Sequence, residues 1–221
     1  MENALEKSYK EALKELRNNL STMLPAEALE TWNNDAKELQ RKHSSILKLK
    51  VGDLAPDFVL PNAVNKQVSL SEVLKSQKVV LTFYRGTWCP YCNLALNLYQ
   101  SILPQIQEAG ATMIAISPQT PDESLNIKQK NELQYHVLSD TSNKVAKQFT
   151  TVHPNPEKSL EKMTELGYDF DSFYSEEGSE LPIPAVFIIE QNGEVSFAKS
   201  EGGDYRYRVE PSELLEALNN K

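Results

Sequence analysis

A run of six β-branched, apolar and aromatic residues leads directly into two closely spaced cysteines, and this arrangement limits the possible folds more than any other part of the sequence. The run Val-Val-Leu-Thr-Phe-Tyr spans 79–84, and Cys89-Pro90-Tyr91-Cys92 opens a stretch in which apolar residues have helical spacing. A continuous run of this kind is typical of a buried strand in a parallel sheet. The cysteine pair is therefore predicted to lie between a central strand and the first turn of a helix.

The sequence on either side continues this alternation of strands and helices. The helical pattern extends through 94–106, with a kink expected at Pro104, and a second buried strand is expected at 111–116. A helix, a strand and a helix are expected at 121–132, 135–138 and 142–149. Hairpins are predicted at 58–70 and 184–198, the latter around Asn192-Gly193, and a closing helix at 211–218. These elements predict an α/β fold in which helices flank a central sheet.

Two amphipathic helices are predicted before this α/β region. Apolar residues recur every three or four positions from Leu5 to Leu20 and from Leu29 to Leu39, and Pro25 suits the start of the second helix. We expect residues 1–47 to form a helical extension and residues 48–221 to form the principal domain. The apolar stripes need a partner surface, so these helices either cover that domain or build a homodimer. The polar segment 153–181 is interpreted as an insertion.

Composition excludes several classes of protein. The net charge is −8 and basic residues are scattered among acidic ones, so no nucleic-acid partner is expected. No run approaches the ~18 apolar residues of a membrane span, and residues 1–20 lack the apolar segment of a signal peptide, so a cytoplasmic protein without membrane association is expected. Only two cysteines occur, three positions apart, which indicates redox chemistry and not a disulfide scaffold.

The predicted position of the cysteine pair gives it a chemical meaning. Unpaired N–H groups and partial positive charge at a helix N-terminus stabilise a thiolate at Cys89, which is the nucleophilic form. Cys92 lies on the same helical face, close enough to close a small disulfide ring. Two inert buried thiols are one alternative, and a zinc site is another. Zinc needs four ligands, and the three histidines lack ligand spacing to the pair, so neither a metal nor another cofactor is expected; they are His43, His136 and His153.

Residues beside the pair are candidates for assisting it. Arg85 can offer a fixed cation to a thiolate and to an oxygen that develops negative charge, or it can be a surface or structural arginine. Thr87 can donate a hydrogen bond to Cys89 or cap the helix, and Trp88 can shield the pair or form a docking surface, although both are also consistent with simple structural roles.

Two features farther along the chain complete the set of candidates. Pro184 stands at the first position of a predicted strand, where no ladder donor is lost. Arg206 and Arg208, among Tyr205 and Tyr207, form a small basic and aromatic patch, which we interpret as a solvated face, with a role in the site as the alternative.

Taken together, three motifs give the chain a family likeness. The run Val-Gly-Asp-Leu-Ala-Pro-Asp-Phe at 51–58, the run Phe-Tyr-Arg-Gly-Thr-Trp-Cys-Pro-Tyr-Cys at 83–92, and Pro184 before a strand and an Asn-Gly hairpin resemble the peroxiredoxin-like family (alkyl hydroperoxide reductase/thiol-specific antioxidant, AhpC/TSA). The resemblance covers about residues 48–220. It implies a thioredoxin-like fold with a mixed central sheet, and a peroxide as the substrate.

The resemblance also assigns roles to residues. It implies that Cys89 attacks the peroxide and becomes a sulfenic acid, that Cys92 condenses with it to a disulfide, and that a thioredoxin- or glutaredoxin-type protein reduces this disulfide. It makes Pro184 a cis-proline that faces the pair. The expected catalytic residues are Cys89, Cys92, Arg85 and Thr87, and the expected substrate-binding residues are Tyr84, Trp88 and Pro184.

The sequence departs from the family pattern at two positions. The family has a proline seven residues, and a threonine or serine three residues, before the attacking cysteine, where this chain has Thr82 and Gly86. Arg85 and Thr87 are the nearby substitutes for the missing hydroxyl. The Cys-Pro-x-Cys spacing resembles thioredoxin and glutaredoxin, so a thiol-disulfide oxidoreductase acting on protein or glutathione disulfides is an alternative. A binding module with idle cysteines is a third hypothesis.

Overall fold

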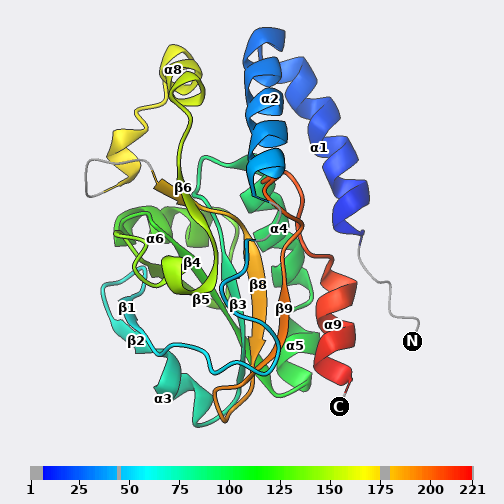
Figure 1. The fold of residues 1–221 in the computed structure, drawn as a ribbon, viewed down its shortest axis with the longest axis vertical. Helices are drawn as coiled ribbons and strands as arrows, with labels where there is room; N and C mark the ends of the chain where they lie inside the picture. Colours follow the sequence, from blue (N-terminus) through cyan, green and yellow to red (C-terminus); the bar gives the residue numbers. More distant parts are fainter. Residues whose placement is uncertain (1–6, 44–45, 175–179, 221) are drawn as a thin grey trace.

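A five-stranded mixed sheet forms the centre of the computed structural model, which describes residues 7–43, 46–174 and 180–220 (Figure 1). The strand order is β5-β4-β3-β8-β9. β3 and β5 both run parallel to β4, whereas β8 runs antiparallel to β3 and to β9. The predicted strand before the cysteines, β3, is central. The bounds are β3 (Lys78–Phe83), β4 (Ala111–Ser117), β5 (His136–Ser139), β8 (Ala185–Ile189) and β9 (Val195–Lys199).

Successive residues of these strands point into two apolar layers, one on each face of the sheet. Val80 and Met113 lie in the layer that contains both cysteines, and Leu81 and Ile114 lie in the opposite layer. Five helices contribute to the first layer: α1 (Tyr9–Met23), α4 (Pro90–Ser101), α5 (Leu103–Glu108), α6 (Pro121–Lys130) and α9 (Pro211–Asn219). The second is covered by α3 (Leu70–Leu74) and α7 (Ala146–Phe149). Burial on both faces explains why β3 reads as a continuous apolar run.

The hairpin turns and the break between two helices lie close to the positions that the sequence predicted. β1 (Val59–Pro61) and β2 (Gln67–Ser69) form the first predicted hairpin, and Gly193 takes a φ of 85° in the Asn-Gly turn between β8 and β9. Only a residue without Cβ adopts this angle readily. The kink expected at Pro104 is a complete break at Ile102, after which Pro104 occupies the first turn of α5.

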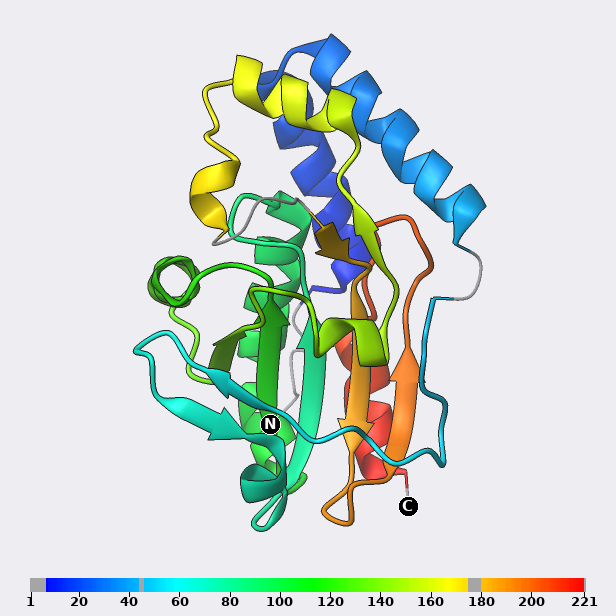
Figure 2. The same ribbon diagram turned by 60° about the vertical axis from the view of Figure 1, so that its left-hand side comes forward.

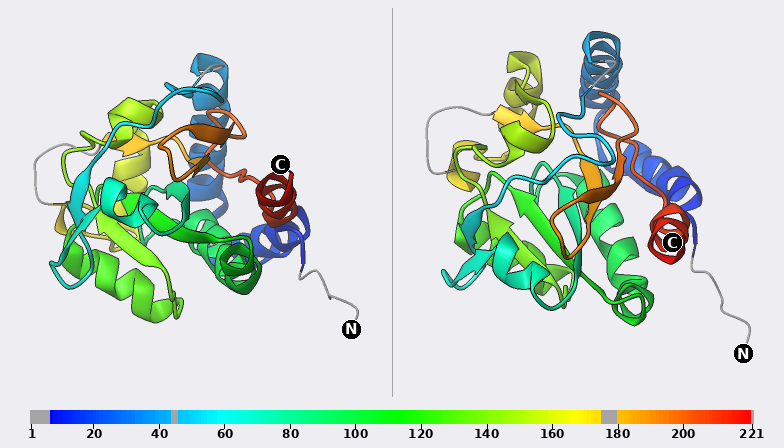
Figure 3. Two further views of the ribbon diagram at one scale, coloured as in Figure 1. Left: turned by 90° about the horizontal axis from the view of Figure 1, so that it is seen from below. Right: turned by 60° about the horizontal axis from the view of Figure 1, so that its bottom comes forward.

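Two helices from the start of the chain and a segment between β5 and β8 gather at one end of the sheet, as Figures 1 and 2 show. α1 (Tyr9–Met23) packs against α4, and α2 (Ala26–Lys42) packs against α8 (Glu157–Glu165). Leu5 lies outside the described residues. The segment also contains β6 (Val152–Pro154), the 3₁₀ turn η1 (Asp171–Phe173) and β7 (Glu180–Pro182). Figure 3 shows α1 and α9 side by side at the edge of the molecule.

The described residues correct one expectation about the backbone. They contain no cis peptide bond, so the bond before Pro184 is trans. Its neighbour Ile183 is held by two hydrogen bonds, since its N–H donates to Thr151 O and its carbonyl accepts from Thr150 Oγ1. Within the same residues, no helix combines the length and apolar character needed to cross a bilayer.

Candidate active site

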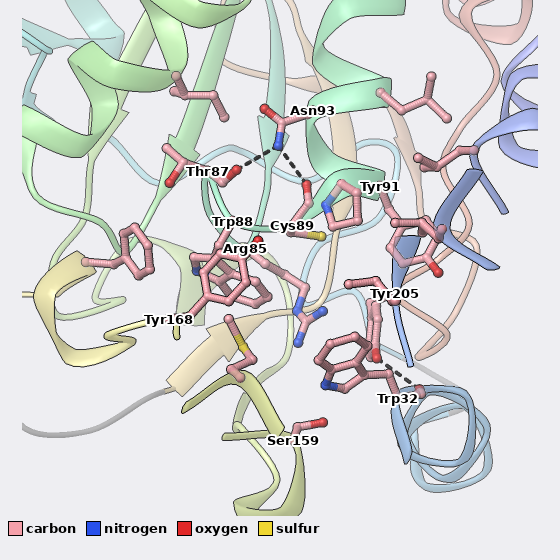
Figure 4. Close-up of a pocket in the computed structure, with 18 of the residues that line it drawn as sticks. Trp32, Arg85, Thr87, Trp88, Cys89, Tyr91, Asn93, Ser159, Tyr168 and Tyr205 are labelled. Atoms are coloured by element: carbon pink, nitrogen blue, oxygen red, sulfur yellow. Dashed lines mark hydrogen bonds between the residues drawn. The ribbon is translucent and has the colours of Figure 1, made fainter. Parts of the chain in front are cut away.

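The two cysteines lie where β3 gives way to α4, at the predicted strand-to-helix junction. Cys89 is the N-cap residue and Cys92 lies in the first turn, with its N–H donating to Cys89 O at 3.0 Å. Pro90 suits the first helical position, because a proline lacks the N–H that would be unpaired there. Both thiols are free and buried, with 1% and 0% of their surface exposed. The side chain of Asn93 ties the turn together by donating to the carbonyls of Thr87 and Cys89 (Figure 4).

A cavity of about 760 Å³ lies against one of the two cysteines only. Cys89 lines it, whereas Cys92 does not. The walls are mostly apolar and come from five parts of the chain: α1 and α2, the loop before α4 with the start of that helix, α6, the segment around α8, and Tyr205. Apolar lining residues are Leu16, Leu20, Met23, Leu24, Leu29, Trp32, Leu94, Ile127, Met163 and Phe173. The helical extension therefore forms a wall of the cavity over the cysteine.

Arg85 is a buried cation at the floor of this cavity. Only 4% of it is exposed, and its guanidinium lies 3.7 Å from the ring centre of Tyr205 and 4.8 Å from that of Trp88 (Figure 4). Its Nη2 is 3.5 Å from Asn155 Oδ1, while its Nε and Asn155 Nδ2 have no partner in the structure. Buried polar groups are normally paired, so these two unpaired donors, on residues that line the cavity, indicate a place where a polar atom of a ligand can bind.

Thr87 does not make the hydrogen bond to Cys89 that the sequence suggests. Its hydroxyl accepts from Gln119 Nε2 at 3.1 Å and donates to Glu123 Oε2 at 3.4 Å, and its N–H donates to Gln119 Oε1 at 2.6 Å. The buried side-chain amide of Gln119 needs hydrogen-bond partners, and Thr87 supplies them. Thr87 therefore anchors the loop before the pair instead of contacting the sulfur.

The remaining sequence candidates lie at different distances from the cavity. Trp88 lines it, and its Nε1 donates to the hydroxyl of Tyr174 at 2.9 Å while its ring packs against Phe170. Tyr84 and Pro184 are buried and do not line it. Tyr84 packs in the same core layer as the cysteines. Of the three expected substrate-binding residues, only Trp88 therefore lines the cavity, whereas Tyr84 and Pro184 are buried away from it.

The structure brings Arg208 to the pair, and our interpretation of this residue as part of a solvated face is wrong. Arg208 is 7% exposed, and its Nη2 donates to Cys92 Sγ at 3.1 Å. Its Nη1 donates to the carbonyls of Tyr205 and Tyr207, which orient the guanidinium. No spacing rule connects residues 116 positions apart. The only signal in the sequence is the cluster of arginines and tyrosines, a composition that buried and exposed sites share.

Electrostatics separate the two thiols. Burial disfavours ionisation of both. The hydrogen bond to Cys92 and the negative charge there add to burial and raise the pKa of Cys89 well above its ordinary value. For Cys92, the hydrogen bond from Cys89 and the positive charges of Arg208 and Arg85 outweigh burial and hold its pKa well below that value. The sequence predicted the thiolate at Cys89, whereas the contact with Arg208 favours the charged form of Cys92.

The described residues contain no group of three or more His, Cys, Asp and Glu side chains arranged to hold a metal ion. His153 is a buried histidine that the charge of Arg85 influences. Burial and the charge of Arg85 lower the pKa of His153 to about 4, so this ring is neutral near pH 7. Its Nδ1 bonds to the carbonyl of Pro154.

Comparisons with known proteins agree with this architecture. Residues 51–198 match the model of the AhpC/TSA family. The chain is 31% identical over 101 residues to peroxiredoxin Bcp of Escherichia coli, covering 46% of this chain and 64% of that protein. It is 34% identical over 108 residues to the chloroplastic peroxiredoxin Q of Suaeda salsa, covering 49% and 50%. These alignments span less than two thirds of each relative.

Solved structures show the same fold. Peroxidoxin BcpB from Mycobacterium tuberculosis superposes with a TM-score of 0.60 at 22% identity, covering 77% of this chain and 96% of that chain. Peroxiredoxin Q of Xanthomonas campestris gives 0.54 at 16% identity, covering 73% and 89%. The predicted thioredoxin-like fold with a mixed central sheet is confirmed. The helices α1 and α2 and Arg208 lie outside the residues that the family model matches.

Proposed function

Because the chain belongs to the AhpC/TSA family, we propose that it is a thiol-dependent peroxidase that reduces hydroperoxides through Cys89 and Cys92. The observation that carries this proposal is the different setting of the two thiols, since Cys89 lines the cavity and Cys92 does not. A small molecule in the cavity meets the first sulfur, and the second lies within reach on the same helical turn. This arrangement supports an attacking residue and a resolving residue.

In this mechanism, Cys89 attacks the terminal oxygen of the hydroperoxide. A bond forms between Cys89 Sγ and that oxygen, the O–O bond breaks, and an alcohol or water leaves. Cys92 then displaces hydroxide from the sulfenic acid and forms the disulfide. Arg85 supports the first step, because a buried cation stabilises the negative charge that develops on the departing oxygen. The free donors of Arg85 and Asn155 are suited to bind the peroxide oxygens.

The cavity favours an organic hydroperoxide over hydrogen peroxide as the preferred substrate. Hydrogen peroxide needs only a small polar site, whereas this cavity has about 760 Å³ lined by leucine, methionine and aromatic side chains. When an apolar group of the substrate fills the cavity, apolar surface is removed from water, and this favours binding. We expect the Leu20→Trp variant, which narrows the cavity from α1, to lower kcat/KM for cumene hydroperoxide by about tenfold or more while sparing hydrogen peroxide. Equal losses with both substrates would contradict this preference.

The disulfide must be reduced before another cycle, and we propose a thioredoxin- or glutaredoxin-type protein as the reductant. Its thiolate would attack the disulfide and form a mixed disulfide with one of the two sulfurs. Cys89 is the sulfur that lines the cavity, so it is the one we expect in this mixed disulfide. Trapping of a thioredoxin variant that lacks its own resolving cysteine tests this order.

Mass spectrometry with thiol labelling tests the peroxidase proposal directly. The reduced protein receives one equivalent of hydroperoxide and is quenched at a series of times. We expect loss of both free thiols in the native chain, a sulfenic acid at Cys89 in the Cys92→Ser variant, and no hydroperoxide consumption by the Cys89→Ser variant. Oxidation of the native protein no faster than that of a free thiol would refute the proposal.

A thiol-disulfide oxidoreductase is the second candidate, and one observation favours it. Gly86 stands where the family pattern has a hydroxyl, and the hydroxyl of Thr87 is bound to Glu123 and Gln119 instead of Cys89. The site therefore lacks one common means of activating peroxide. Reduction of insulin or glutathione disulfide, without peroxide, tests this function. Absence of both activities would exclude it.

We propose residues 1–47 as a helical extension of a redoxin domain that comprises residues 48–221. Tyr9 and Leu13 of α1 are buried against the core layer that contains α4, which supports a role in covering that domain. Homodimer formation through these helices is a separate proposal. Sedimentation of the full chain over a range of concentrations distinguishes a monomer from a dimer.

A further inference from the structure

The helical hairpin made of α1 and α2 is firmly packed at its base and loosely packed at its tip. At the base, side chains from both helices are buried, Tyr9 and Leu39 among them. In the tip, which we define as residues 20–31, only Ala28 is buried, and Met23 is 76% exposed. A segment with so few buried side chains can open at a low cost in free energy.

The loop before α9 holds the base of α2 in place. The main chain of Gly203 leaves no room for a Cβ against the carbonyl of Leu39. The N–H of Asp204 donates to Gln40 Oε1 at 2.8 Å, and the hydroxyl of Tyr205 donates to the carbonyl of Trp32 at 3.0 Å. All of these contacts lie beyond residue 31, so they fix the base and not the tip.

One ion pair joins the tip to the opposite wall of the cavity. Lys162 Nζ of α8 lies 2.8 Å from Glu27 Oε1 of α2. Within the described parts of the chain, it is the only ion pair or hydrogen bond between residues 20–31 and any segment outside α1 and α2. The Glu27 side chain is 78% exposed, and exposed ion pairs hold weakly. We call this pair the clasp; the tip and α8 lie at the same end of the molecule in Figures 1 and 2.

The tip also covers the reactive cysteine. Leu20, Leu24 and Leu29 line the cavity that Cys89 lines, and Cys89 is only 1% exposed. The cavity of about 760 Å³ has the size of a small-molecule site, so a hydroperoxide or a small thiol can enter it. A folded domain of about 100 residues has a radius of gyration of about 13 Å and cannot enter. A protein reductant therefore needs part of this wall to move.

We propose that the tip and α8 form a gate that decides which thiols reach Cys89. While the clasp is closed, the gate admits hydroperoxides and small thiols; when the clasp opens, the tip moves away from α8 about its fixed base and uncovers the cysteine for a protein reductant. The proposal rests on the disulfide and the protein reductant proposed above. It makes Glu27 and Lys162 determinants of reductant specificity, in a hairpin that lies outside the residues matched by the family model.

The reaction that the gate controls is a balanced thiol-disulfide exchange. A thiolate of the reductant attacks Cys89 Sγ, a new S–S bond forms, and the bond between Cys89 and Cys92 breaks, with Cys92 leaving as a thiolate. The second thiol of the reductant loses its proton and attacks the mixed disulfide, which releases Cys89. The reductant is oxidised to its own disulfide and supplies both electrons. Because the first attack must reach Cys89 Sγ, its rate depends on the fraction of molecules in which the gate is open.

A zero-length cross-link across the clasp tests whether opening is required. The full chain is oxidised with diamide, which forms the disulfide without peroxide, and a carbodiimide then joins Lys162 Nζ to the Glu27 carboxylate as an amide. Mass spectrometry of tryptic peptides gives the cross-linked fraction. We expect this fraction to be reduced by dithiothreitol at the native rate and by a bacterial thioredoxin at least about tenfold more slowly. Reduction of the cross-linked fraction by thioredoxin at the native rate would overturn the proposal.

The Glu27→Gln variant is the control for the cross-link. It cannot form this amide but receives the same carbodiimide treatment at every other exposed carboxylate. We expect thioredoxin to reduce it at least as fast as it reduces the untreated native protein. If the treated variant were as slow as the cross-linked native protein, the cross-link at the clasp would not be the cause and the proposal would fail.

Charge reversal tests the gate in the opposite direction. Lys162→Glu places a carboxylate between Glu27 and Glu165, which now both pair with Lys162. We expect about three- to tenfold faster reduction by thioredoxin and an unchanged rate with dithiothreitol. The double variant Glu27→Lys with Lys162→Glu restores opposite charges and should return to the native rate.

Lys158→Glu is the matched control, because it makes the same change of charge at an exposed lysine of the same helix. We expect it to leave both rates unchanged. Equal acceleration by Lys158→Glu and Lys162→Glu would assign the effect to net charge and overturn the proposal, as would no acceleration by Lys162→Glu. If the native protein consumed no hydroperoxide, the peroxidase function would fail, whereas the disulfide formed with diamide would still allow the reduction rates to decide whether the gate exists.

Discussion

Gly86 is the position at which a single methyl group should reveal how tightly the loop before the cysteines is packed. A Cβ built there would lie 2.6 Å from Trp88 Nε1 and 3.0 Å from Gln119 Cδ. Real Cβ atoms do not approach this closely, so the Gly86→Ala variant must displace the indole ring or the buried amide. The indole also donates to Tyr174 at 2.9 Å.

The magnitude follows from these contacts. Forcing an added carbon into a packed interior costs about 1–3 kcal/mol, and loss of the indole hydrogen bond adds about 1 kcal/mol. The substitution of glycine by alanine recovers about 0.4–1 kcal/mol by restricting the unfolded chain. We therefore expect Gly86→Ala to lower the free energy of unfolding by about 1–3.6 kcal/mol.

Urea unfolding followed by far-ultraviolet circular dichroism measures this change, with both cysteines kept reduced. A double-mutant cycle with Trp88→Phe provides the control, because phenylalanine lacks the nitrogen that the new Cβ would meet. We expect Gly86→Ala to cost at least about 1 kcal/mol less in the Trp88→Phe background. If Gly86→Ala cost under about 0.5 kcal/mol, or if the two substitutions were additive, the steric reasoning would be refuted. A threonine at this position, as in the family pattern, adds more atoms and should destabilise the protein further.

Three other substitutions should separate structural roles around the site. His153 has a folded-state pKa of about 4, below its unfolded value of about 6.5. Its contribution to the free energy of unfolding is therefore complete above about pH 6.5 and disappears as the pH falls toward 4. Urea titrations should show that His153→Asn abolishes a pH dependence of about 3 kcal/mol over this interval. Asn93→Ala removes the bonds to the carbonyls of Thr87 and Cys89, and its expected cost is about 2 kcal/mol in the same assay. Tyr99→Phe leaves one buried main-chain carbonyl without its 2.8 Å partner and should lower the melting temperature through a loss of about 1 kcal/mol, whereas no change would mean that the carbonyl finds another donor.

The parts of the fold that the sequence predicted depend on local patterns. A strand buried on both faces has to be apolar throughout, as β3 is, and the Asn-Gly turn requires a positive φ at Gly193. The helix through the cysteine pair also follows from neighbouring residues. Short-range sequence patterns could therefore place Cys89 and Cys92 correctly at the start of α4.

The rest of the site depends on contacts between distant segments, which no local pattern records. The segment 153–181 is polar overall, yet Met163, Phe170 and Leu181 form a buried cluster against which Trp88 packs. Arg208 is another example, because burial of a cation depends on what the rest of the chain places around it.

The two buried arginines explain how an apolar cavity and an ionised sulfur can exist together. A thiolate at the cavity wall would be poorly solvated by leucine and methionine side chains, and burial raises the pKa of Cys89 for this reason. Arg208 instead favours the charge on Cys92, which does not line the cavity. Arg85 lines the cavity and is suited to stabilise the negative charge that develops on the departing peroxide oxygen. The apolar cavity can thus select its substrate without opposing the chemistry at its floor.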